Sequence, residues 1–257
     1  MTAIPEALQP RDAFHGMRQI LRFNWPFYAV AVPIAVGAPY AIGATPLPTA
    51  VRAAAYSATA LVWLWLIGSI VASWIVYDHS ELMTGSWIPG LVGETPGRWV
   101  SVHAGLDEMT PVLERLLGTT GRVLDIFDPS QMTEPSIARA RTPSRSPAVE
   151  CVDFRRLPIE DASMDAAFLL LSAHELRTHA SRVSLLTEVR RSLAPGGHAI
   201  VAEHLRDISN VVAYGPGALH FHSRRTWLRT FAASGLLVAR ERSITRFVRV
   251  FVLRRSS

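Results

Sequence analysis

The chain has 257 residues, a formal net charge of +5 and a hydrophobic content of 49%. A single cysteine, Cys151, excludes an intrachain disulfide. The basic residues are all arginine and form no uninterrupted run, so nothing in the charge pattern supports nucleic-acid binding. The mean hydropathy is positive, and the apolar excess lies before residue 78, which indicates a membrane-associated N-terminal part followed by a globular domain.

Two uncharged stretches predict a transmembrane hairpin. No charged side chain occurs in residues 23–51 or in residues 53–77, and a helix that spans the hydrocarbon needs about 20 apolar residues. We expect spans at about 25–44 and 53–77. Pro33 and Pro39 fall inside the first stretch, so a kinked spanning helix and a re-entrant segment both fit it.

The distribution of arginine predicts the orientation of this hairpin. Residues 1–22, the segment before the first span, include Arg11, Arg18 and Arg22, whereas Arg52 is alone in the loop between the spans. Positively charged segments stay on the cytoplasmic side, so the N-terminus is expected inside. With two spans the C-terminus is then also cytoplasmic. This predicts a multi-pass protein of the membrane (the inner or cell membrane in a bacterium), with the lipid bilayer as its partner.

The remaining chain predicts an α/β domain. Residues 78–104 are rich in Gly, Pro and Trp and predict a connector along the membrane surface, and residues 105–257 predict the domain. Helices are expected from Thr110 to Gly118 and at 135–141, 182–193 and 223–233, a loop at 142–147, and strands at 122–126, 148–152, 166–172, 198–202, 236–244 and 247–253. This alternation favours a doubly wound parallel sheet with an antiparallel C-terminal end.

Three stretches of this domain carry a resemblance to a known family. They are Asp153–Asp165 (DFRRLPIEDASMD), Glu188–Glu203 (EVRRSLAPGGHAIVAE) and Phe231–Leu253. Together they resemble the class I S-adenosylmethionine-dependent methyltransferases, in the small-molecule branch that includes quinone methyltransferases. The resemblance covers about residues 105–254. It implies a Rossmann-like sheet and S-adenosylmethionine as cofactor.

The resemblance also makes residues 122–126 the expected first strand, and here the chain departs from the family. The family has a glycine loop after that strand, whereas the stretch 125–130 reads DIFDPS and contains no glycine. Asp125, Asp128 and Asp153 remain as the expected cofactor-binding residues, with Asp128 adding negative charge near the cofactor's carboxylate. Only 28 positions separate Asp125 from Asp153, which is room for one crossover, so we expect the sheet to be shortened by one strand–helix unit.

Polar residues follow two of the predicted strands and predict the catalytic site. His174 and Glu175 follow one strand, Glu203 and His204 follow the next, and ligands of open α/β sheets bind at the carboxyl ends of strands. A carboxylate can orient a histidine for proton transfer, so we expect these four residues to be catalytic. The same donors could bind a divalent metal, but their spacing matches no metal motif, and no metal ligand is predicted. The residues expected to contact substrate are His103, Arg206, His220 and His222.

Three functions remain open at this point. The first is a membrane-anchored methyltransferase-like enzyme whose hydrophobic small-molecule substrate partitions into the bilayer. The second is a cofactor-free acid–base enzyme, an isomerase or lyase, on the same fold. The third is a non-catalytic scaffold derived from a methyltransferase. The substrate, the accepting atom and the oligomeric state are left open by the sequence.

Overall fold

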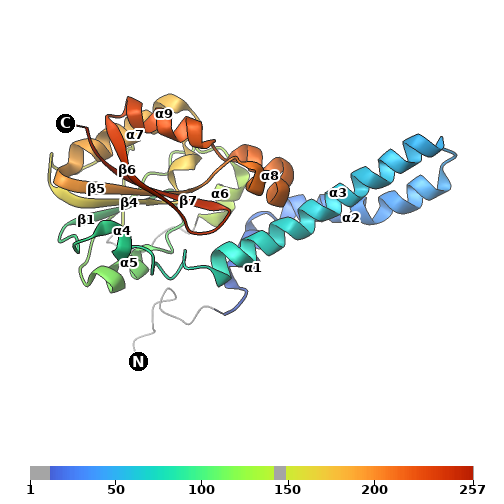
Figure 1. The fold of residues 1–257 in the computed structure, drawn as a ribbon, viewed down its shortest axis with the longest axis horizontal. Coiled ribbons are helices and arrows are strands. Elements are labelled where there is room, and N and C mark those ends of the chain that lie inside the picture. Colours follow the sequence, from blue (N-terminus) through green and yellow to red (C-terminus); the bar gives the residue numbers. More distant parts are fainter. Residues whose placement is uncertain (1–11, 142–148, 257) are drawn as a thin grey trace.

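The computed structural model describes residues 12–141 and 149–256. The predicted loop at 142–147 lies outside the described residues, and so do Arg11 and Ala148. The N-terminal part is helical, in the order α1 (His15–Phe23), α2 (Trp25–Ala44), α3 (Thr49–Trp74) and the π-helical turn η2 (Ile75–His79). Helices α2 and α3 form a hairpin that projects away from the rest of the molecule (Figure 1).

The hairpin has the length and composition predicted for membrane spans. Helix α2 is one continuous helix of 20 residues that includes Pro33 and Pro39, and α3 with η2 runs for 31 residues. The side chains hold the pair together, since the Trp63 indole donates to the Ala35 carbonyl at 3.2 Å and Tyr28 is hydrogen-bonded to Ser69 at 2.9 Å. Both helices are long and apolar enough to cross a membrane. Only 6% of the apolar 18-residue stretch of α2 is buried within the protein.

The globular part contains a seven-stranded sheet in the order β3-β2-β1-β4-β5-β7-β6. The strands are β1 (Trp99–His103), β2 (Arg122–Asp125), β3 (Val149–Cys151), β4 (Met164–Leu170), β5 (Leu193–His204), β6 (Leu236–Ser243) and β7 (Val248–Arg255). The first five are parallel, and β7 lies antiparallel to both β5 and β6. The predicted doubly wound α/β sheet with an antiparallel C-terminal end is therefore confirmed.

The prediction of a shortened sheet is wrong. Strand β1 lies between β2 and β4, so the strand at 122–126, expected to be the first, is the second. All five residues of β1 are buried. The strand was assigned to the connector 78–104 because it has only five residues and follows a Gly/Pro/Trp-rich stretch. Such short apolar runs give little periodicity from which to recognise a strand.

Helices cover both faces of the sheet (Figure 1). One face packs against α6 (Pro135–Ala140), α7 (His179–Ser192) and α9 (Arg224–Ala233), and the other packs against α5 (Thr110–Leu117) and the segment before α4 (Pro89–Val92). In that segment Leu82, Trp87 and Ile88 are at most 2% exposed. The predicted connector therefore contributes apolar side chains to the core, where their burial is favourable.

A short helix after β5 packs against the hairpin. Helix α8 (Ile208–Tyr214) and the 3₁₀ turn η4 (Gly215–His220) lie beside α3 (Figure 1). The approach is close, because a Cβ on Gly68 would lie 3.1 Å from the Ala213 carbonyl oxygen and one on Gly215 would lie 2.4 Å from the Trp65 ring. Gly215 also has φ +53°, a conformation that favours glycine. Glycine at both positions therefore lets the domain pack directly on α3.

Candidate active site

The four residues predicted to be catalytic lie at the carboxyl ends of two neighbouring strands. Strands β4 and β5 pair in parallel as far as Leu170 and Ala202. His174 and Glu175 follow on the 3₁₀ turn η3 (Ala173–Glu175), and Glu203 and His204 end β5. All four side chains are buried. The four residues therefore lie at the same edge of the sheet, as predicted, but the two histidines have different partners.

Glu203 holds His174 in place. One carboxylate oxygen accepts the backbone N–H groups of Ala173 and His174 at 3.0 and 3.2 Å. The other lies 2.6 Å from His174 Nδ1, and because an ionised carboxylate only accepts, Nδ1 carries the proton. Glu203 has no exposed surface, so these three donors compensate a buried charge. His174 Nε2 is thereby directed away from Glu203.

Glu175 lies between two histidines. Its Oε1 is 3.3 Å from His174 Nε2 and 3.8 Å from Nε2 of His220, the last residue of η4. Nδ1 of His220 faces Glu134 at 3.4 Å, so that ring too has a carboxylate on its Nδ1 side. Of the predicted substrate-contacting residues, His220 is therefore the one that joins the cluster. We call His174, Glu175, Glu203 and His220 the His/Glu cluster.

The charges of the His/Glu cluster are strongly coupled. Burial opposes protonation of His174, but attraction to Glu203 and Glu175 and hydrogen bonds to both raise its pKa to about 10. Burial likewise opposes ionisation of Glu175, but His174 and His220 hold its pKa below the usual range. The cluster therefore retains a positive charge between two carboxylates at neutral pH.

His204 is not part of the His/Glu cluster. Its Nδ1 lies 3.0 Å from the Phe247 carbonyl, which only accepts, so Nδ1 is the donor. Its Nε2 then accepts from the Tyr77 hydroxyl at 2.9 Å. The Phe221 ring stacks on the imidazole at 4.8 Å between centroids. Both ring nitrogens are engaged, so His204 joins β5 to the end of the hairpin rather than facing a substrate.

Two other predicted substrate residues also lie outside the His/Glu cluster. His222 Nε2 is 2.8 Å from the Arg182 guanidinium. Burial, followed by the positive charges of Arg182 and Arg177, lowers the pKa of His222 to about 3, so its ring stays neutral and accepts from Arg182. Arg206 has an exposed side chain, and its backbone N–H donates to the His222 carbonyl at 3.0 Å.

A glycine turn follows β1 rather than β2. Gly105 has φ +100° and donates its N–H to His103 Nδ1 at 3.0 Å. His103, one of the residues expected to contact substrate, is the last residue of β1 and is buried. The sequence contained a signal for this turn, because an acidic residue about 20 positions after the glycine is typical of nucleotide-binding βαβ units, and Asp125 is at that distance.

Asp125 lies beside this turn at the end of β2, paired in register with His103. One carboxylate oxygen accepts the Phe127 N–H at 3.0 Å, and the other accepts from the Arg141 guanidinium at 3.0 Å. The guanidinium also lies 4.3 Å above the Phe127 ring, and the Arg141 Cγ would be 2.7 Å from a Cβ on Gly105. The Arg141 side chain therefore occupies the space between the glycine turn and Asp125.

The other two aspartates predicted to bind cofactor are capping residues. Asp128 accepts from the Ser130 N–H and hydroxyl, which lower its pKa, and Asp153 accepts from the Arg155 N–H. Arg155 contacts both carboxylates, at 3.5 Å from Asp128 and 3.2 Å from Asp153. Asp128 follows β2, whereas the glycine turn follows β1. Asp128 therefore does not replace a residue of the glycine loop, where its charge was expected to lie near the cofactor's carboxylate.

Comparison with known proteins identifies the class of this domain. Residues 105–201 match the family model described as a methyltransferase domain. The pyocyanin biosynthetic protein PhzM superposes with a TM-score of 0.57 at 18% identity, covering 97% of this chain and 75% of that one. The PH0226 protein from Pyrococcus horikoshii OT3 superposes with a TM-score of 0.51 at 14% identity, covering 68% and 89%. No curated protein matches the chain.

A third solved structure, described as a SAM-dependent methyltransferase from Aquifex aeolicus, has a TM-score of 0.49 and 17% identity, covering 67% of this chain and 91% of that one. The family match and the strand order together show that the C-terminal part of the chain is a class I S-adenosylmethionine-dependent methyltransferase domain. The predicted resemblance is thereby confirmed. The match begins at Gly105, just after β1.

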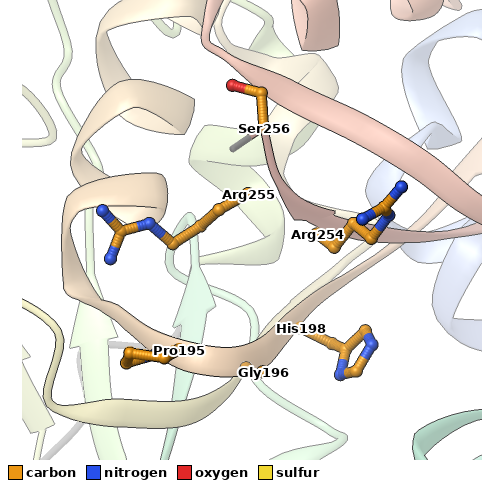
Figure 2. Close-up of a pocket in the computed structure, with 7 residues that line it drawn as sticks. Pro195, Gly196, His198, Arg254, Arg255 and Ser256 are labelled. Carbon is orange, nitrogen blue, oxygen red and sulfur yellow. The ribbon is translucent and has the colours of Figure 1, made fainter.

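A surface hollow lies at the opposite edge of the sheet. It is lined by residues 195–198 in the first part of β5 and by residues 254–256 at the end of β7, and these include His198, Arg254 and Arg255 (Figure 2). Because the parallel strands start at this edge, the hollow is remote from the carboxyl ends where ligands of such sheets bind. His198 is therefore a suitable control position for tests of the His/Glu cluster.

The environment of His204 predicts a pH dependence of folding. Burial, together with the positive charge of His174, lowers its pKa to about 4, below the value of 6.5 expected in the unfolded chain. Between these values the unfolded chain binds a proton that the folded chain does not. His204 should therefore lower the free energy of unfolding by about 3 kcal/mol as pH falls from 6.5 to 4, and His222, whose pKa is also lowered, should add to the decline in the same direction.

Urea unfolding of the detergent-solubilised protein, followed by tryptophan fluorescence across this range, would measure the effect. His204→Gln should reduce the decline by the share that belongs to His204 and leave the part that comes from His222. His15→Gln changes a histidine whose side chain is 44% exposed and should leave the whole decline in place. An equal decline in wild type and His204→Gln would contradict the assignment.

Proposed function

We propose that this protein is a membrane-anchored methyltransferase that uses S-adenosylmethionine to methylate a lipid-soluble small molecule. One observation carries the proposal. Large apolar side chains are exposed on the hairpin, on α8 and on η4, α8 packs on α3, and η4 ends at His220 in the His/Glu cluster. A substrate dissolved in the bilayer would reach the polar site without leaving apolar surroundings.

The helix lengths support this placement of the membrane. With a rise of about 1.5 Å per residue, the 20 residues of α2 span about 30 Å, which equals the thickness of the hydrocarbon core. The 26 residues of α3 span about 39 Å. The last turns of α3 would therefore extend into the head-group region, and α8 packs on that part of α3 through Gly68.

The outer face of α8 and η4 is apolar. Ile208 is 83% exposed, Val212 is 55% exposed and Leu219 is 64% exposed. Large apolar side chains gathered on a surface are typical of interaction sites, and α8 lies against α3, whose own outward side chains are apolar and exposed. We place this face at the head-group level, where it would admit a substrate from the acyl chains.

The carboxyl ends of β1 and β2 fit the methyl donor. Gly105 keeps the backbone free of a Cβ beside Asp125, and a carboxylate at the end of the second strand is the group that binds ribose hydroxyls in related folds. Arg141 now fills this space, but it is a long, flexible side chain at the end of α6, so rotation could open it. S-adenosylmethionine supplies an electrophilic methyl group carried by a sulfonium.

The His/Glu cluster would serve the acceptor. During transfer the acceptor oxygen or nitrogen forms a bond to the methyl carbon, the carbon–sulfur bond breaks, and the electron pair remains on sulfur. The acceptor proton must leave, and we propose that it passes to the Glu175 carboxylate, whose Oε2 has no hydrogen-bond partner among the described residues, because His174 is already protonated at neutral pH. Holding the two reactants in line supplies much of the rate, and the hairpin contributes by keeping the site beside the bilayer.

Removal of Arg141 should strengthen cofactor binding. Arg141→Ala frees Asp125 and the space beside Gly105, so we expect the dissociation constant for S-adenosylmethionine to fall several-fold, equivalent to about 1 kcal/mol. Asp125→Ala should weaken binding at least 10-fold. Calorimetric titration of the solubilised protein would measure both dissociation constants. Arg155→Ala is the matched control, because among the described carboxylates Arg155 contacts only Asp128 and Asp153. Absence of binding in wild type and Arg141→Ala alike would favour the cofactor-free acid–base enzyme.

The apolar face of α8 should be accessible from lipid. In a Cys151→Ser background, a fluorophore on Ile208→Cys or Val212→Cys should be quenched by brominated lipids in nanodiscs. A fluorophore on Leu237→Cys, a position 43% exposed on β6, should respond to a water-soluble quencher instead. Quenching of the α8 labels by the water-soluble reagent alone would place this face in solvent and remove the substrate route.

The hairpin should place both termini on one side of the membrane, which we propose is the cytoplasm. A reporter fused after Gly43, next to the loop between α2 and α3, should therefore report the opposite side from a reporter fused after Ser257. Activity on the same side for both fusions would exclude the hairpin.

A further inference from the structure

We infer that the His/Glu cluster is a site for a divalent transition metal of the Zn²⁺ class, bound by His174, Glu175 and His220. One ligand atom from each residue lies within 4.8 Å of the others. Two histidine nitrogens and one carboxylate oxygen form a donor set that suits zinc, and in catalytic zinc sites this set leaves a position open. The spacing in the sequence gives no sign of it, because His220 is 45 positions from Glu175.

The geometry of the three donors carries the inference. Both Nε2 atoms point to the same oxygen, Glu175 Oε1, at 3.3 and 3.8 Å. Bonds of about 2.1 Å at a tetrahedral metal separate its ligand atoms by about 3.4 Å, so small rotations, with release of the proton on His174 Nε2, would bring all three onto one ion. In addition, Glu175 Oε2 is buried and has no hydrogen-bond partner among the described residues. A buried carboxylate oxygen without a partner is costly unless a cation binds it.

The second nitrogen of each histidine supports the same conclusion. Nδ1 of His174 is 2.6 Å from Glu203, and Nδ1 of His220 is 3.4 Å from Glu134. Histidines that bind metals typically donate their other N–H to a carboxylate, which fixes the tautomer and the ring orientation. The His174 ring has that arrangement, the Nδ1 side of His220 faces a carboxylate at longer range, and the Nε2 of each ring is directed at the proposed metal position.

Arg177 contacts both segments that carry the proposed histidine ligands. Its guanidinium donates to the backbone carbonyls of His174 and His220 at 3.4 and 2.5 Å, and it lies 3.5 Å from His220 Nδ1. It therefore faces the Nδ1 side of His220 and leaves Nε2 free. Its charge is offset by the three carboxylates Glu134, Glu175 and Glu203. Arg177 would act as a positioning residue that fixes the two ligand-bearing segments to each other.

Zinc binding to the full-length solubilised protein tests the inference. After dialysis against a chelator, wild type should bind one Zn²⁺ per chain in calorimetric titration and in metal analysis. Substituting Co²⁺ should give the visible absorption of a nitrogen/oxygen site. His220→Ala and Glu175→Gln should each weaken Zn²⁺ binding at least 100-fold, and Glu203→Gln should weaken it 10- to 100-fold by releasing His174. His198→Ala, at the opposite edge of the sheet, should bind as wild type does.

The inference would be overturned if wild type bound no stoichiometric Zn²⁺, or if His220→Ala bound it as tightly as wild type. His220 decides the question even if Glu175→Gln fails to fold, because its side chain is 21% exposed and its truncation leaves little unfilled space. A catalytic role for the metal rests on the proposed function, whereas Zn²⁺ binding itself does not. Zn²⁺ binding is measured without S-adenosylmethionine, and S-adenosylmethionine binding is measured on the Arg141 and Asp125 variants, so either proposal can fail alone.

Discussion

The buried carboxylate of Glu203 constrains the whole carboxyl edge of the sheet. An ion without exposed surface costs several kcal/mol unless it is paired and hydrogen-bonded. The compensating groups are the backbone N–H groups of Ala173 and His174 and the imidazole of His174, all on the segment after β4. Satisfying one charge at the end of β5 therefore fixes η3, and η3 in turn sets the position of Glu175 and the separation between its carboxylate and His220.

The residue after Glu203 connects this edge to the hairpin. His204 is held between the Tyr77 hydroxyl and the Phe247 carbonyl, and Phe221 stacks on it next to His220. The hairpin, α8 and the His/Glu cluster are thus parts of one packed unit. The ends of β1 and β2 differ, because Arg141 there occupies the space between Gly105 and Asp125. Ligand binding beside Gly105 would require this side chain to move, whereas the groups of the His/Glu cluster are already held by their hydrogen bonds.

Local patterns predicted the features that depend on only a few neighbouring residues. The uncharged stretches predicted two helices, and α2 has the bounds expected for the first. The C-terminal hairpin and the helix capped by Ser223 were predicted correctly, because alternation and capping are properties of short segments. The neighbouring ends of β4 and β5 were also predicted, since the resemblance gave their order. Strand β1 was missed, and with it the glycine turn, because a strand of five residues (WVSVH) after a Gly/Pro/Trp-rich stretch has too little periodicity.

The sequence by itself determined which chemical groups stand at the strand ends, and it identified the methyltransferase domain. Only the tertiary structure decided their roles. His174 and His204 both follow a parallel strand beside a glutamate, yet one joins a carboxylate cluster and the other accepts from Tyr77, which is 127 positions away. Likewise Arg141 occupies the space beside Asp125, and His220 reaches Glu175 from a turn that packs on α3. Hydrogen-bond partners, burial and charge coupling act over a few ångströms in space, and packing of the sheet and helices, rather than separation along the chain, sets those distances.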